Sequence, residues 1–117
     1  MLPSKKSPHL STPTLLQPWN GKRVAQVVAG SNHSLLLTQE GSVFAFGRNE
    51  EGQLGVGLQS GSSHVAKHVL FERHVVSLAA GDKHSVFVIE GGEVFWSGLV
   101  PGMGAKDLPS PIKALAR

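Results

Sequence analysis

Two stretches of this chain repeat one another 51 residues apart. The first reads GSNHSLLLTQEGSVFAFG (residues 30–47) and the second reads GDKHSVFVIEGGEVFWSG (residues 81–98). Extended to residues 24–47 and 75–98, they align without a gap and agree at nine of 24 positions. Either one binding or catalytic motif is used twice, or one structural unit is made twice. The shared residues are Val24/Val75, Ala29/Ala80, Gly30/Gly81, His33/His84, Ser34/Ser85, Gly41/Gly92, Val43/Val94, Phe44/Phe95 and Gly47/Gly98.

Each copy has the pattern of three short strands joined by tight turns. In the first copy, apolar runs at residues 24–29, 34–38 and 43–46 are separated by Gly30 and by QEGS at 39–42. Gly41 can adopt the positive φ that a hairpin turn requires. The second copy predicts the same three strands at residues 75–80, 85–89 and 94–97.

A fourth strand should complete each unit. Three segments that flank the two copies are expected to form such strands, at residues 12–19, 65–71 and 111–115. A four-stranded sheet that recurs about every 50 residues is typical of a β-propeller blade. The sequence therefore predicts an all-β fold made of two four-stranded antiparallel blades of an incomplete β-propeller. Residues 12–117 are expected to hold the two blade repeats, with cores at 24–57 and 75–104.

The charge of the chain is concentrated in its first residues. The net charge of the 117 residues is +3, yet residues 1–23 hold four Lys or Arg and no acid. We expect residues 1–11 to be a disordered basic leader, and binding of nucleic acid by the nearly neutral body is not favoured. No apolar run approaches a membrane span or a signal peptide, so an intracellular protein, cytoplasmic or nuclear, is expected.

The histidines are the obvious candidates for chemistry. His33 and His84 each precede a serine, but neighbouring residues on a strand point to opposite faces and cannot form a nucleophile–base pair. Both histidines are expected to be structural and to pin their turns.

Metal binding is not expected either. His64 and His68 are four residues apart on an expected strand, about 13 Å from each other, which is too far to share a metal. His74 and the absence of cysteine do not change this interpretation. The sequence therefore predicts no catalytic residue, no metal, no cofactor and no enzyme.

Residues 30–57 resemble the repeat of the regulator of chromosome condensation family. That repeat runs Gly-x-x-His-Ser, an apolar run, then Gly-x-Val-aromatic-x-aromatic-Gly-x-Asn-x-x-Gly-Gln-Leu-Gly. The second copy departs from it, because Trp96 stands one place early, Ser97 replaces an aromatic residue, and residues 99–107 lack the Asn-to-Gly ending. The first copy meets the pattern at Gly30, His33, Ser34, Gly41, Val43, Phe44, Phe46, Gly47, Asn49, Gly52, Gln53, Leu54 and Gly55.

The resemblance implies a seven-bladed propeller in full-length members, of which this chain holds two blades. The chain is then part of a larger polypeptide, a truncated or spliced product, or a subunit that assembles with copies of itself through exposed blade edges.

Three functions stay open on these grounds. The first is a protein-interaction module or scaffold, with Arg48, Asn49, Glu50 and Glu51 in a blade turn and an outward-facing Trp96 as partner-binding residues. The second, implied by the resemblance, is guanine-nucleotide exchange or regulation of a small GTPase as part of a complete propeller. The third is association with chromatin through the basic leader.

Overall fold

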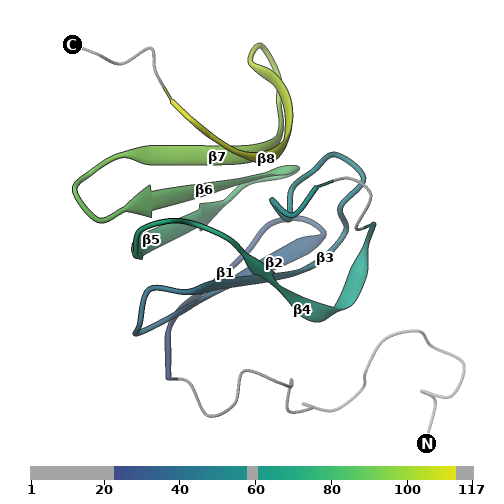
Figure 1. Cartoon of the computed structure of the whole chain (residues 1–117). Helices are drawn as coiled ribbons and strands as arrows, with labels where there is room; N and C mark the ends of the chain where they lie inside the picture. Colours follow the sequence, from purple (N-terminus) through teal and green to yellow (C-terminus); the bar gives the residue numbers. More distant parts are fainter. Residues whose placement is uncertain (1–22, 58–60, 113–117) are drawn as a thin grey trace, which may run out of the picture.

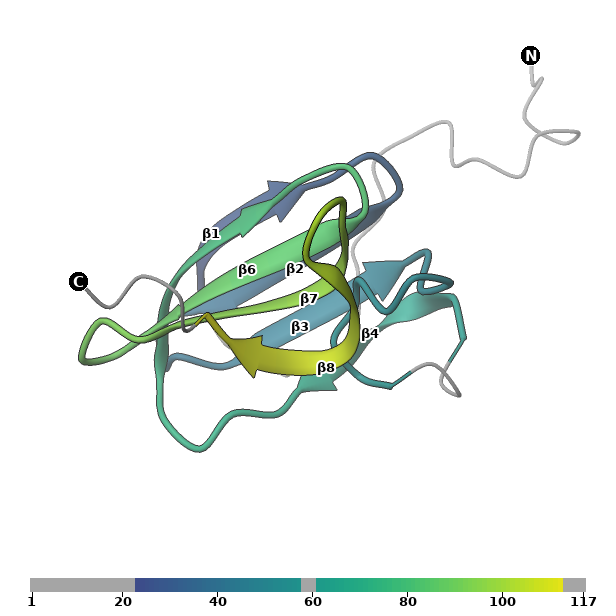
Figure 2. The same ribbon diagram turned by 90° about the horizontal axis from the view of Figure 1, so that it is seen from above.

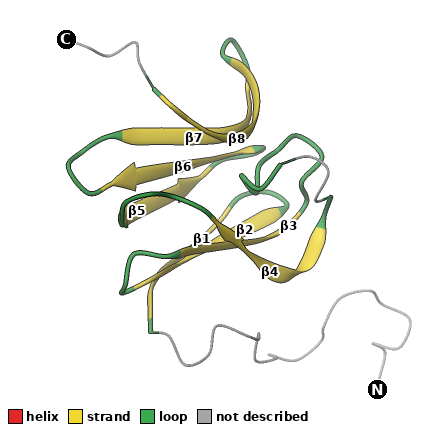
Figure 3. Ribbon diagram, in the orientation of Figure 1, coloured by secondary structure: helices red, strands yellow, loops and turns green. Residues whose placement is uncertain are grey.

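The computed structural model describes residues 23–57 and 61–112 and folds them into eight strands in two sheets (Figure 1). In each sheet the strands are antiparallel and follow the order of the chain. Figure 3 shows strands and loops only along these described residues. The predicted all-β class, with two four-stranded antiparallel blades of an incomplete propeller, is confirmed. The first blade contains β1 (Val24–Ala29), β2 (His33–Thr38), β3 (Val43–Gly47) and β4 (Ser63–Val69), and the second contains β5 (Val75–Ala80), β6 (His84–Ile89), β7 (Val94–Val100) and β8 (Gly104–Pro111).

The fourth strand of each blade follows the three strands with which it forms a sheet. The segment expected at 65–71 is β4, which begins two residues earlier and pairs with β3. The fourth strand of the second blade, β8, begins at Gly104, seven residues before the segment expected at 111–115, and ends at Pro111. Residues 113–115 of that expected segment lie outside the described residues. The strand expected at 12–19 and the leader at 1–11 lie outside the described residues.

Sheet register repeats along with the sequence. The first strand of each blade carries an irregularity near its start, between Val24 and Gln26 in β1 and between Val75 and Ser77 in β5. A bulge increases the local twist of a strand, so the same distortion shapes both blades. The repeat therefore specifies backbone geometry as well as side chains.

The turn between β2 and β3 depends on Gly41. Its φ is 92°, as the sequence predicts, and its N–H donates to the Thr38 carbonyl at 3.0 Å. The Gly41 carbonyl accepts from Val75 N at 3.0 Å, and a Cβ here would lie 2.6 Å from the His74 Cβ. A glycine is therefore needed both for the turn and for the close approach of the second blade.

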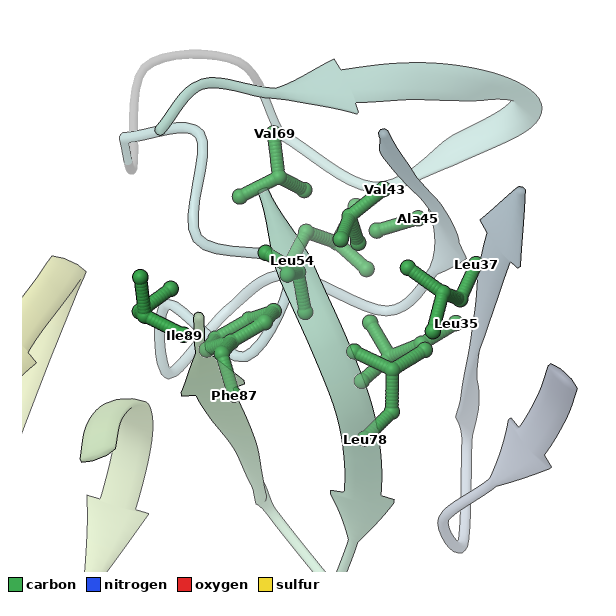
Figure 4. Packing of buried hydrophobic residues seen from close by; sticks show 10 residues of the cluster. Leu35, Leu37, Val43, Ala45, Leu54, Val69, Leu78, Phe87 and Ile89 are labelled. Carbon is green, nitrogen blue, oxygen red and sulfur yellow. The ribbon is translucent and has the colours of Figure 1, made fainter. Parts of the chain in front are cut away.

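One hydrophobic core lies between the two blades (Figure 4). Apolar side chains from β2 and β3 face those of β5 and β6, and Leu54 enters from the loop after β3. Leu35 and Phe87 are fully buried, one from each blade. The fully buried members of this cluster are Leu35, Val43, Ala45, Leu54 and Phe87, at 0% exposure.

The loops leave the blades at two opposite ends (Figures 1 and 2). One end carries the β1–β2 turn at 30–32, the β3–β4 loop that starts at 48, and the β5–β6 turn at 81–83. We call this end the loop end. The opposite end carries the turns at 39–42 and 90–93 and the β4–β5 connection at 70–74. Over the described part of the chain, no helix has the length and apolarity to cross a membrane.

Candidate functional site

The β3–β4 loop holds a cluster of charged side chains at the loop end. Arg48 contacts the Glu50 carboxylate at 2.7 Å and that of Glu51 at 3.2 Å. The hydrogen bond from Arg48 lowers the pKa of Glu51, and Glu51 in turn raises the pKa of Arg48. The side chains of Arg48 and Glu50 are 40% and 66% exposed, so both reach solvent in a fixed arrangement.

Asn49 supports this cluster from inside. Asn49, predicted as a partner-binding residue, is only 1% exposed in this chain. Its Nδ2 donates to the Gly57 carbonyl at 2.9 Å, and its Oδ1 accepts from Leu54 N at 3.0 Å. The buried amide thus closes the loop on itself, as buried polar groups require partners.

A shallow depression of about 370 Å³ opens beside Arg48 and Glu50. Asn32 and Ser62 line it as well, so it lies between the β1–β2 turn and the β3–β4 loop. The second blade extends the same end, because Ser31 Oγ donates to Asp82 at 2.5 Å. The loop end is therefore one polar surface built by both blades.

His33 joins the two blades beneath this surface. Its Nε2 lies 3.1 Å from the His84 carbonyl and 2.9 Å from Ser85 Oγ, both in the second blade. The ring also lies against Gly30, where a Cβ would come within 2.4 Å of the His33 Cε1. The expected structural role thus takes another form, a bond from one blade to the next.

The hydrogen-bond network fixes the tautomer of His33. Ser85 Oγ donates its one proton to the Gln53 carbonyl at 2.6 Å, so it can only accept from His33. His33 therefore carries its proton on Nε2, and Nδ1 is buried without a hydrogen-bond partner among the described residues. Burial lowers the pKa of His33 below its ordinary value of 6.5, and the hydrogen bond to the His84 carbonyl opposes this shift.

This arrangement does not form a nucleophile–base pair. A base must accept the hydroxyl proton, but His33 donates to Ser85 through Nε2. Ser85 is also 0% exposed, so no substrate reaches its hydroxyl. The pair is a structural link between the blades.

A second side chain repeats this kind of link at the first strands. Gln26 Nε2 donates to the Leu78 carbonyl at 3.2 Å, and Gln26 Oε1 accepts from Leu78 N at 3.0 Å. One amide side chain therefore satisfies both backbone groups of a residue in β5. The junction combines these bonds with the apolar core, which holds the two halves of the loop end in register.

Trp96 lies in a different environment from the one expected. It takes the place in the second blade that Ala45 takes in the first, and it pairs with Val86 and Ser110. Successive strand residues alternate faces, so Trp96 points away from Phe95 and from the first blade. The expectation that Trp96 is exposed is wrong, because only 4% of the residue is exposed. The one-place shift puts Ser97 on the inner face instead, where it is fully buried.

His68 and His74 lie apart from each other in separate contacts. His68 stacks on Phe44 with the ring centroids 4.9 Å apart, and His74 lies at the other end of the β4–β5 connection, 3.8 Å from Glu90. Over residues 23–57 and 61–112, no three His, Cys, Asp or Glu side chains are close enough to hold a metal ion.

Comparison with known proteins identifies the repeat. Two models of the regulator of chromosome condensation (RCC1) repeat match residues 24–53 and 40–88. The chain belongs to the regulator of chromosome condensation family. The second match begins before β3 and ends in β6, so this repeat spans the junction between the blades.

Relatives of this RCC1-repeat chain are much longer than the chain itself. It is 38% identical over 92 residues to the mouse regulator of chromosome condensation, a match that covers 77% of this chain and 22% of that protein. It is 37% identical over 90 residues to the Arabidopsis thaliana ultraviolet-B receptor UVR8, covering 76% of this chain and 20% of the receptor. The chain thus spans about a fifth of these relatives.

Solved structures share the fold of the RCC1-repeat chain. Human WBSCR16 superposes with a TM-score of 0.78 at 25% identity, over 88% of this chain and 28% of that one. Yeast RCC1 (Prp20), solved with Kap60 bound, superposes with a TM-score of 0.74 at 24% identity, over 86% of this chain and 27% of that one. The two blades are therefore an arrangement found within larger chains.

Proposed function

We propose that this RCC1-repeat chain is a protein-interaction module and that its loop end binds a partner protein. The single observation that carries the proposal is the fixed cluster of Arg48, Glu50 and Glu51 on a surface that both blades build. Loops on a rigid frame are where propellers and other β-proteins commonly carry binding residues. The partner is expected inside the cell, in the cytoplasm or nucleus, and the name of the mouse relative, regulator of chromosome condensation, fits the nucleus.

The chemistry of the cluster favours a polar, charge-complementary partner. Glu50 projects into solvent at 66% exposure, while Arg48 is held between two carboxylates. A partner cation would meet Glu50 first, and a partner carboxylate would meet Arg48 or Lys83. Charged pairs of this kind set specificity and association rate more than affinity.

Charge reversal tests this proposal. Immobilised wild-type chain, Glu50→Lys and Glu90→Lys are compared for the cellular proteins that they retain, quantified by mass spectrometry. Glu90 serves as the matched control, because it is an exposed glutamate at the opposite end of the blades. We expect a set of proteins that Glu50→Lys loses and Glu90→Lys keeps. Identical profiles for all three chains would contradict binding at the loop end.

A second candidate is regulation of a small GTPase by a longer propeller that contains these two blades. The human X-linked retinitis pigmentosa GTPase regulator supports it, with 34% identity over 91 residues, 76% of this chain and 9% of that protein. Yeast Prp20p, 24% identical, has been studied for its binding to Gsp1p and histones. Nucleotide release from a panel of small GTPases tests it: faster release with the chain supports exchange, and unchanged release excludes exchange by these two blades.

A further inference from the structure

A groove of about 630 Å³ runs between the blades near the end opposite the charged cluster. The β4–β5 connection forms one wall and β7 with β8 forms the other. Residues before and after the junction of the two blades line it together. Its volume lies within the range of about 300–1,000 Å³ that binding pockets occupy.

Aromatic packing makes the floor of this groove rigid. Phe71 lies with its ring centroid 5.0 Å from that of Phe87 and 5.6 Å from that of Phe95. Ile89, which is 2% exposed, lies beside them. Phe87 and Ile89 also belong to the main core, which anchors the floor to the centre of the molecule.

The two walls each present a leucine to solvent. Leu70 is 76% exposed and Leu108 is 54% exposed, and both line the groove. Leu70 lies in the β4–β5 connection and Leu108 in β8, so apolar residues lie on both walls of the groove. Paired exposed leucines above an aromatic floor mark an apolar interaction site more strongly than single surface leucines do.

The charge at the rim is negative. Arg73 is hydrogen-bonded to Glu93 across the groove, which leaves this pair neutral. Glu72 also lines the groove, and no ion pair joins it to another described residue. Among the described residues, Glu72 is thus the groove-lining carboxylate that has no ion-pair partner.

We propose that this groove binds a segment of a partner protein that inserts one large apolar side chain and places a lysine or arginine beside it. The apolar side chain covers Leu70, Phe71 and Leu108, and the cation pairs with Glu72. The groove lies away from the Arg48 cluster and constitutes a second interaction surface, which goes beyond the proposed function and is tested by different variants.

Peptide selection tests the assignment without a known partner. A random dodecapeptide phage library is selected on the wild-type chain and counter-selected on Leu108→Asp. We expect enriched peptides to share a large apolar residue next to Lys or Arg, and to bind Leu70→Asp and Leu108→Asp at least about tenfold more weakly. Met103→Asp is the matched control, because Met103 is 51% exposed in the β7–β8 turn outside the groove, and it should bind as the wild type does.

Three results would overturn the proposal. Enrichment of acidic peptides contradicts the charge assignment, and equal loss in Met103→Asp contradicts the location. Absence of enrichment, with dimerisation of the chain that Leu108→Asp abolishes, assigns the groove to a second copy instead. Thermal unfolding of each variant confirms that the exposed substitutions leave the fold intact.

Discussion

The Nε2 of His33, in the first blade, lies 2.9 Å from the hydroxyl of Ser85, in the second. The Ser85 hydroxyl in turn donates to the carbonyl of Gln53, which belongs to the first blade. Two residues of equivalent repeats thus hold neighbouring blades together at the base of the loop end.

Removal of the His33 ring should weaken the junction. His33→Ala removes a buried hydrogen bond and the contact with Gly30, which we expect to cost about 1–3 kcal/mol of unfolding free energy. His84→Ala is the matched control, since His84 occupies the same repeat position and its ring makes no hydrogen bond with a described residue. Urea denaturation measures both. Equal losses of unfolding free energy in the two variants would contradict a specific role of the His33 ring in joining the blades.

The junction should also respond to pH. Because burial lowers the folded pKa of His33 below 6.5, the folded state binds fewer protons than the unfolded state. The stability is therefore full above pH 6.5 and is lost as the pH falls through the folded pKa. We expect His33→Gln to lose part of the decline that the wild type shows between pH 7.5 and 5. Parallel pH profiles of the urea midpoint for both chains would exclude His33 as the cause.

The conformation of the loop that carries Arg48, Glu50 and Glu51 should depend on Asn49. Asn49→Ala leaves Leu54 N and the Gly57 carbonyl without their side-chain partners, at a cost of about 1–3 kcal/mol. Asn32→Ala is the control, because Asn32 is exposed in the neighbouring turn. The chemical shifts of Arg48 and Glu51 should move in the first variant alone. Similar stability and spectra for both variants would show that Asn49 does not support the loop.

Close approach of the two blades should make Gly30 intolerant of a side chain. A Cβ at Gly30 would lie 2.2 Å from the Gly81 carbonyl oxygen, which belongs to the second blade. Gly30→Ala should therefore destabilise the fold by more than Gly102→Ala, where a Cβ meets nothing within 4 Å and the cost is the positive φ of 89°, about 1–2 kcal/mol. Thermal unfolding of the two variants compares them, and a smaller loss at Gly30 would contradict the packing.

The repeat carries the information for the fold in local patterns. Apolar alternation and turn glycines such as Gly41 recur at the same spacing, so the first three strands of each blade are predictable from the sequence. The β8 strand is not, because the second copy has lost its pattern after Gly98, and the β7–β8 hairpin depends on tertiary pairing. The groove beside Leu70 and Leu108 depends on the same region, and no local pattern indicates it.

The candidate site was predictable only in outline. The loop at 48–51 is visible as a break between strands, but the burial of Asn49 follows from bonds to Leu54 and Gly57 that the sequence does not order. The partner of His33 could be guessed as a blade neighbour only once the two sheets were known to face each other. Alternation along β7 could have placed Trp96 on the other face of the sheet from Phe95. The burial of Trp96 could not be predicted from that pattern.

The central claim is that the two blades form one unit joined through His33 and Ser85. A double-mutant cycle of His33→Ala, Ser85→Ala and the double variant tests it most directly, with unfolding free energies from urea denaturation. We expect a coupling energy of about 1 kcal/mol, because each single variant removes the same hydrogen bond. A coupling energy near zero would mean that the two side chains act independently, which would contradict the account.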